Sequence, residues 1–161
     1  MKEILDKCCG VDVHKKTFTA CIMLGKSKEI KTYSTITQDI KCFAKWLQEN
    51  DIKHVAIEST GVYWVPLFNI LEQDFEIILV NARHIKNVPG RKTDVKDSEW
   101  LCKLLKNGLL EKNFVPGKDF RNLRNLLRYR KKCVEGITAE KNRILKILET
   151  VNDLPPKFVH F

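Results

Sequence analysis

Four acidic residues stand at positions where a carboxylate needs a chemical reason: Asp12, Glu58, Asp94 and Asp97. The first interrupts an apolar stretch, and the second closes the apolar run at 55–57. The last two are three residues apart at the expected start of a helix, so both project from one face. A carboxylate in an apolar strand is costly unless it is paired or holds a cation. Clustered carboxylates suit Mg²⁺ or Mn²⁺, and two such ions about 4 Å apart support phosphodiester displacement. The pattern therefore predicts a metal site.

Each acid also has a structural explanation that stays open at this stage. Asp12 could pair with His14 or Lys15 at the end of its strand, and Glu58 could be an exposed strand end. Asp94 and Asp97 could complement the positive end of the helix dipole. Together, an acid in the first strand, a second acid at a strand end and a helical pair favour the metal site.

Two dense basic clusters accompany a net charge of +9, which favours a polyanionic partner. The first cluster surrounds Asp94 and comprises Arg83, Lys86, Arg91, Lys92 and Lys96. The second lies near the C-terminus and comprises Arg121, Arg124, Arg128, Arg130, Lys131 and Lys132. Because carboxylates repel DNA, a site that accepts phosphodiesters needs such cations nearby. The clusters favour nucleic-acid binding over a merely solvated surface.

The elements that would position these residues can be read from the apolar pattern. Strands at 8–13, 17–24 and 29–36 form an antiparallel three-stranded meander. They are followed by a helix that ends at 50–51, a strand at 54–57, a helix at 66–73, a strand at 75–80, a loop at 81–92 and a helix at 94–107 stopped by Gly108. Strands that alternate with helices after a meander predict an α/β fold with a mixed sheet and crossover helices.

A long C-terminal helix is predicted by residues that recur in steps of four and three. This seam comprises Leu123, Leu127, Arg130, Val134, Ile137, Lys141, Ile144, Leu148 and Val151. A heptad seam of this length predicts a coiled coil or another helix pairing, and thus a homo-oligomer. Its two basic members, Arg130 and Lys141, predict a weak and salt-sensitive pairing. The alternative is one long helix packed back on its own domain.

Several other classes of protein are disfavoured. No apolar run approaches the roughly 18 residues that a membrane span needs, and the N-terminus does not resemble a secretory signal. The six cysteines form no C-x-x-C pair, and several lie among apolar neighbours, which indicates a reduced, cytoplasmic compartment. The glycine-rich phosphate loops of nucleotide-binding enzymes are missing.

Three stretches resemble the N-terminal domain of the insertion-sequence one-ten DEDD transposases, a bacterial family that includes the Piv and MooV DNA recombinases. They are GVDVHK at 10–15, IESTGVYW at 57–64, and the run from VNARHIK at 80–86 through GRKTDVKD at 90–97. The resemblance covers residues 8–150. It implies an RNase H-like (RuvC-like) domain whose four acids map by motif onto Asp12, Glu58, Asp94 and Asp97, with Mg²⁺ (or Mn²⁺) as cofactor. His14 and His84 also match family motifs and are candidates for phosphate contact.

The resemblance further implies DNA as a partner and, in many members, a structured guide RNA. Family members continue through a coiled coil into a second domain that bears a serine nucleophile. No stretch here resembles the serine motif, so we expect that domain to be absent and the chain alone to be incomplete for strand exchange.

We therefore expect a RuvC-like DEDD catalytic domain at 1–118, a long basic helix at 119–153 and a tail at 154–161. The expected function is that of the metal-binding catalytic domain of a cytoplasmic DNA transposase or site-specific recombinase, with no membrane contact. Two alternatives stay open. One is a stand-alone RuvC-like structure-selective endonuclease, and the other is a non-catalytic nucleic-acid-binding dimerisation module.

Overall fold

The computed structural model describes residues 5–59, 61–81 and 97–150 of the chain. The chain divides into two compact units, Met1–Val115 and Pro116–Phe161, which are described separately. Among the described residues, no helix has the length and apolar character that crossing a membrane requires.

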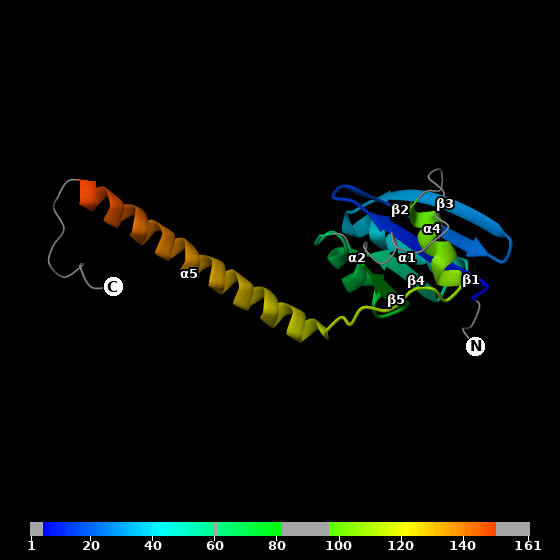
Figure 1. Cartoon of the computed structure of the whole chain (residues 1–161). Helices are drawn as coiled ribbons and strands as arrows, with labels where there is room; N and C mark the ends of the chain where they lie inside the picture. The colour runs from blue at the N-terminus through cyan, green and yellow to red at the C-terminus, as the bar shows by residue number, and fades with distance from the viewer. Residues whose placement is uncertain (1–4, 60, 82–96, 151–161) are drawn as a thin grey trace. The chain divides into compact units, whose positions relative to one another are not determined.

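The first unit is built on one five-stranded sheet with the order β3-β2-β1-β4-β5 (Figure 1). The strands are β1 (Lys7–Val13), β2 (Thr17–Leu24), β3 (Ser27–Ser34), β4 (His54–Glu58) and β5 (Glu76–Val80). The first three form an antiparallel meander, whereas β4 pairs with β1, and β5 with β4, in parallel. The predicted fold class is confirmed: an RNase H-like α/β mixed sheet with a meander and crossover helices, followed by a long C-terminal helix.

Helices cover both faces of this sheet. The crossover helices α1 (Thr37–Glu49) and α2 (Trp64–Leu71) pack on one face, where Phe18 and Phe43 lie in an aromatic core. Helix α4 (Asp97–Lys106) packs on the other face, over a smaller apolar cluster. Because successive side chains of a strand point to opposite faces, every second residue of β1 faces α4.

The start of α2 differs from the prediction by two residues. It begins at Trp64 rather than at Pro66, so the proline lies in the first turn of the helix. A proline costs no hydrogen bond there, because the first backbone N–H groups of a helix have no partner within it. Similarly, β3 begins at Ser27 rather than at residue 29, because the hairpin turn needs only two residues.

The end of α4 follows the prediction. Gly108 adopts a positive φ of 63°, and its N–H donates to the carbonyl of Leu105. The next N–H, of Leu109, donates to the carbonyl of Leu104. Glycine favours this left-handed conformation, which satisfies the last carbonyls of a helix.

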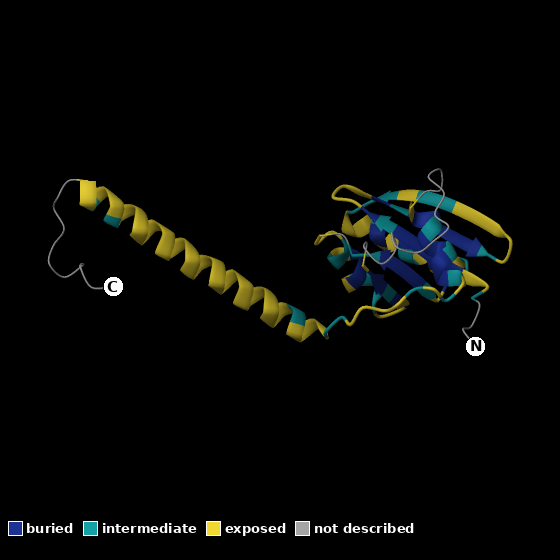
Figure 2. Ribbon diagram, in the orientation of Figure 1, coloured by how far each residue is buried: buried dark blue, intermediate teal, exposed yellow. Residues whose placement is uncertain are grey.

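The second unit consists of the single helix α5 (Lys118–Thr150). Near its start, the N–H of Arg121 donates to the carbonyl of Gly117, and the guanidinium donates to the carbonyl of Pro116 at 2.8 Å. None of the 33 residues of α5 is buried (Figure 2). The predicted long helix is thus present, with most of its apolar residues exposed.

Candidate active site

Two of the predicted acids lie side by side at the carboxyl ends of neighbouring strands. Val11 of β1 is paired with Ile57 of β4, so Asp12 and Glu58, each one residue further along, are adjacent. Asp12 is also paired with Thr19 of β2, and Glu58 with Val80 of β5. These paired residues form one row across the sheet. Since Val80 belongs to the apolar cluster beneath α4, the side chains of Asp12 and Glu58 lie on the sheet face that α4 covers.

The direction of α4 brings its first residue, Asp97, to the same end of the sheet. The N–H of Leu5, just before β1, donates to the carbonyl of Lys106 in the last turn of α4. Further along β1, the Sγ atom of Cys8 lies 3.5 Å from that of Cys102. The helix therefore runs antiparallel to β1, and its N-terminus points to the end of the strand that carries Asp12. We call Asp12, Glu58 and Asp97 the carboxylate corner.

The three members of the carboxylate corner differ in exposure. The side chain of Asp12 is 19% exposed, and its Oδ2 lies 3.3 Å from Nε2 of His14, which is 70% exposed. Glu58 is half-buried, and Asp97 is exposed. The pairing of Asp12 with His14 is the one that the sequence left open.

A charge cluster that the sequence did not predict holds α4 on the meander. Glu99 of α4 accepts from Lys28 of β3 at 2.9 Å and from Lys103 at 2.8 Å. Hydrogen bonds from Lys103 and Lys28 hold the pKa of Glu99 below its usual range. Lys106 donates to the carbonyl of Gly25 in the hairpin turn. From sequence spacing, only the i,i+4 pair of Glu99 with Lys103 could be predicted, because Lys28 is 71 residues away from Glu99.

Three thiols fill the space beneath α4. Cys8, Cys21 and Cys102 are fully buried there within the smaller apolar cluster. Hydrogen bonds with Cys21 and Cys8 raise the pKa of Cys102 well above its usual range. These thiols pack as small core residues that seat the helix.

The predicted nucleic-acid contacts fall into two groups. Arg83, His84, Lys86, Arg91, Lys92 and Lys96 lie outside the described residues, as does the fourth acid, Asp94. On α5, Arg124 and Arg128 are exposed, whereas Arg121 is half-buried and its guanidinium contacts Pro116.

The donor chemistry of the carboxylate corner fits a hard divalent cation. Carboxylates from β1, β4 and α4 supply the oxygen ligands that Mg²⁺ and Mn²⁺ prefer. In their present positions, no three His, Cys, Asp or Glu side chains of the described residues form a group that could hold a metal ion.

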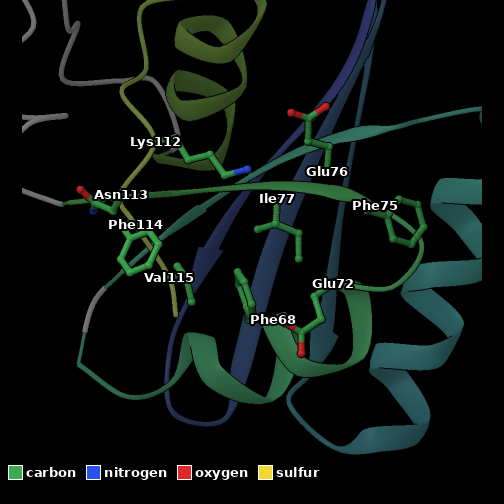
Figure 3. Close-up of a pocket in the computed structure, with 9 residues that line it drawn as sticks. All are labelled: Phe68, Glu72, Phe75, Glu76, Ile77, Lys112, Asn113, Phe114 and Val115. Atoms are coloured by element: carbon green, nitrogen blue, oxygen red, sulfur yellow. The ribbon is translucent and has the colours of Figure 1, made fainter. Parts of the chain in front are cut away.

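A hollow of about 620 Å³ lies away from the carboxylate corner (Figure 3). It is lined by α2, β5 and residues 112–115, and it includes Phe68 and Ile77 of the larger core. It therefore opens on the sheet face opposite α4 and contains none of the predicted acids.

Known proteins similar to this chain include two gene-inverting proteins. The pilin gene-inverting proteins of Moraxella bovis and Moraxella lacunata are each 28% identical to it over 104 residues, which cover 58% of this chain and 32% of theirs. The matched region therefore spans about a third of the length of these relatives.

Among solved structures, RuvC of T. thermophilus in complex with a Holliday junction substrate aligns with a TM-score of 0.48 and 8% identity, covering 68% of this chain and 100% of RuvC. The Fowlpox virus resolvase in complex with Holliday junction DNA aligns with a TM-score of 0.38 and 15% identity, covering 54% of this chain and 65% of the resolvase.

The chain also matches a protein family over most of its length. The transposase family of the DEDD insertion-sequence one-ten type matches residues 9–152, which is most of the sequence. The chain therefore belongs to the insertion-sequence one-ten family of DEDD transposases.

Proposed function

We propose that this chain is the metal-binding catalytic domain of a DNA transposase or site-specific recombinase, which cuts and rejoins DNA phosphodiesters during transposition. The observation that carries the proposal is the carboxylate corner. Three acids from β1, β4 and α4, distant in sequence, lie toward one end of the sheet. Family membership supports the same chemistry.

In this proposal, Asp12, Glu58 and Asp97, together with Asp94, hold Mg²⁺ or Mn²⁺. When bound, the cations would activate an oxygen nucleophile and stabilise the leaving oxygen. The carboxylates keep their charge in order to hold the cations, so the DNA phosphates must be neutralised by other groups. We assign that role to Arg83, His84, Lys86, Arg91, Lys92 and Lys96, which precede or separate the helical acids in sequence.

The partners follow from the same proposal. We infer that the full-length protein acts in the bacterial cytoplasm on DNA, guided by a structured RNA, and that a second domain supplies the serine nucleophile. Arg121, Arg124 and Arg128 on α5 would contact the nucleic-acid backbone, with Arg124 and Arg128 better placed to do so because they are exposed.

One observation favours a second candidate, the nucleic-acid-binding dimerisation module. Helix α5 exposes a series of large apolar residues beside its arginines, among them Leu127, Ile137 and Ile144. A catalytic domain could also pair through this helix. Replacing the acids distinguishes a catalytic domain from a pure binding module, because a pure binding module would hold no metal and would keep its DNA affinity and its assembly.

The test is a calorimetric titration with Mn²⁺, with and without a DNA duplex. We expect the parent chain to bind Mn²⁺ and the variants Asp12→Asn and Asp97→Asn to lose at least tenfold in affinity. The matched control is Asp74→Asn, which removes an exposed acid outside the carboxylate corner. Equal Mn²⁺ affinity in all four proteins, or no binding under either condition, would contradict the proposed function.

A cleavage assay addresses the remaining alternative. A stand-alone endonuclease would cut branched DNA when the isolated chain is supplied with Mg²⁺. We expect the isolated chain not to carry out strand exchange, because in the proposed function that reaction also needs the serine nucleophile of a second domain.

A further inference from the structure

Gly10 lies at the point where the backbone of α4 comes closest to the sheet. It occupies β1 between Ala56 of β4 and Cys21 of β2, in the row next to that of Asp12. A Cβ atom built on Gly10 would lie 2.9 Å from the Cα of Cys102, and closer still to the backbone N of Cys102 and the backbone O of Ser98. Backbone atoms of a helix cannot rotate away, so α4 can lie at its present height only above a residue without a side chain.

The same close approach lies beside two acids of the carboxylate corner. Asp12 is two residues beyond Gly10 on β1, and Asp97 immediately precedes Ser98 on α4. The distance between α4 and β1 therefore contributes to the distance between the carboxylates of Asp12 and Asp97. The thiols of Cys8 and Cys102, 3.5 Å apart, touch at the same helix–strand interface.

We propose that Gly10 is a positioning residue for the carboxylate corner: its missing side chain sets the distance at which α4 presents Asp97 to Asp12 and Glu58. The inference rests on the proposed function, because it concerns the metal that these carboxylates would hold. A side chain at position 10 must lift α4 by at least 0.5 Å, since its Cβ would otherwise lie 2.9 Å from the α-carbon of Cys102 instead of the ordinary 3.4 Å. A shift of this size would change the separation of Asp97 from Asp12 and Glu58, on which shared binding of one cation depends.

The experiment compares Gly10→Ala with Leu47→Ala in the full chain. Leu47 is fully buried on α1, against the opposite face of the sheet, so its truncation weakens the fold without touching α4. We expect Gly10→Ala to bind Mn²⁺ at least tenfold more weakly than the parent. Leu47→Ala should bind Mn²⁺ with the affinity of the parent, although its Tm should fall by as much as that of Gly10→Ala or more. Equal Mn²⁺ affinity in Gly10→Ala and the parent would overturn the inference.

A second readout does not depend on metal. The thiols of Cys8 and Cys102 are fully buried beneath α4, so lifting the helix should make them react faster with a thiol reagent in Gly10→Ala than in Leu47→Ala. If the parent chain binds no Mn²⁺, the proposed function fails. The inference about Gly10 is tested independently, and it fails if the thiols of Gly10→Ala react no faster than those of the parent.

A milder substitution covers the case in which Gly10→Ala does not fold. Ala56→Val adds two methyl groups beneath the same helix, in the strand next to Gly10. We expect it to lower Mn²⁺ affinity at least threefold and to expose the same thiols. An unchanged affinity together with unchanged thiol rates would contradict the proposal.

Discussion

Nε2 of His14 lies 3.3 Å from Oδ2 of Asp12, so the acid of the first strand faces an imidazole from its own chain. His14 is 70% exposed, and exposed ion pairs contribute only about 0–1 kcal/mol. A divalent cation held by several carboxylates would therefore displace the imidazole from Asp12 at little cost. This relationship is compatible with metal binding, although it also satisfies Asp12 locally.

The first prediction concerns this pair. We expect His14→Ala to change the free energy of unfolding by less than about 1 kcal/mol and the Mn²⁺ affinity by less than about threefold. Thermal unfolding and calorimetry measure the two quantities, and Lys15→Ala is the control for truncating a neighbouring side chain that makes no contact with Asp12 in the described ion pairs. A loss of Mn²⁺ binding in His14→Ala alone would instead identify the imidazole as a metal ligand.

The second prediction concerns Glu99, whose pKa is held below its usual value of 4.5 by hydrogen bonds from Lys103 and Lys28. A carboxyl whose pKa is lower in the folded state stabilises the fold above its unfolded pKa, and this contribution is lost as the pH falls through the folded pKa. We expect Glu99→Gln to cost about 1–2 kcal/mol at neutral pH. The difference in Tm from the parent should shrink as the pH falls below about 4.5.

Circular dichroism melts at a series of pH values measure this difference. The control is Glu49→Gln, which removes an exposed glutamate that pairs with Lys45 on α1 at 4.0 Å. A pH-independent difference between Glu99→Gln and the parent would mean that the charge of Glu99 does not stabilise α4.

The third prediction distinguishes the six cysteines by their reactivity. Cys42 and Cys133 are exposed, whereas Cys8, Cys9, Cys21 and Cys102 are buried. Burial also raises the pKa of Cys9 well above its usual range, which suppresses the reactive thiolate. In the native protein, a thiol reagent should therefore modify two cysteines quickly and the other four only on unfolding. Replacing Cys42 and Cys133 with serine should remove the fast phase, and a fast phase that persists would contradict the burial beneath α4.

The sequence predicted those features in which one residue breaks a local pattern. Asp12 stands out because it interrupts an apolar strand, and Gly108 because it follows a helical pattern. The mixed sheet followed from the meander and the crossovers, since few topologies are compatible with them. The four-acid site itself stays a prediction, because Asp94 lies outside the described residues.

The features that sequence reasoning missed arise from contacts between distant positions. Gly10 appears in the sequence as an ordinary strand glycine, and its role emerges only from the backbone of α4, about ninety residues later. The bond between Lys28 and Glu99 joins an edge strand to a helix on one face of the sheet. Neither has a local period or motif, so a single sequence gives no signal for them.

The last prediction concerns the exposed seam of α5. Leu127 and Ile137 are 58% and 59% exposed, and burying such residues between two helices would contribute about 1.5–3 kcal/mol for each side chain. Two like charges in the seam, Arg130 and Lys141, repel across a paired interface, so association should be weak and should strengthen with added salt. We expect sedimentation to show a concentration-dependent oligomer, which Ile137→Lys shifts to monomer. The control Asn142→Lys adds the same charge outside the seam and should leave association unchanged. A parent chain that stays monomeric at high concentration and high salt would contradict pairing through α5.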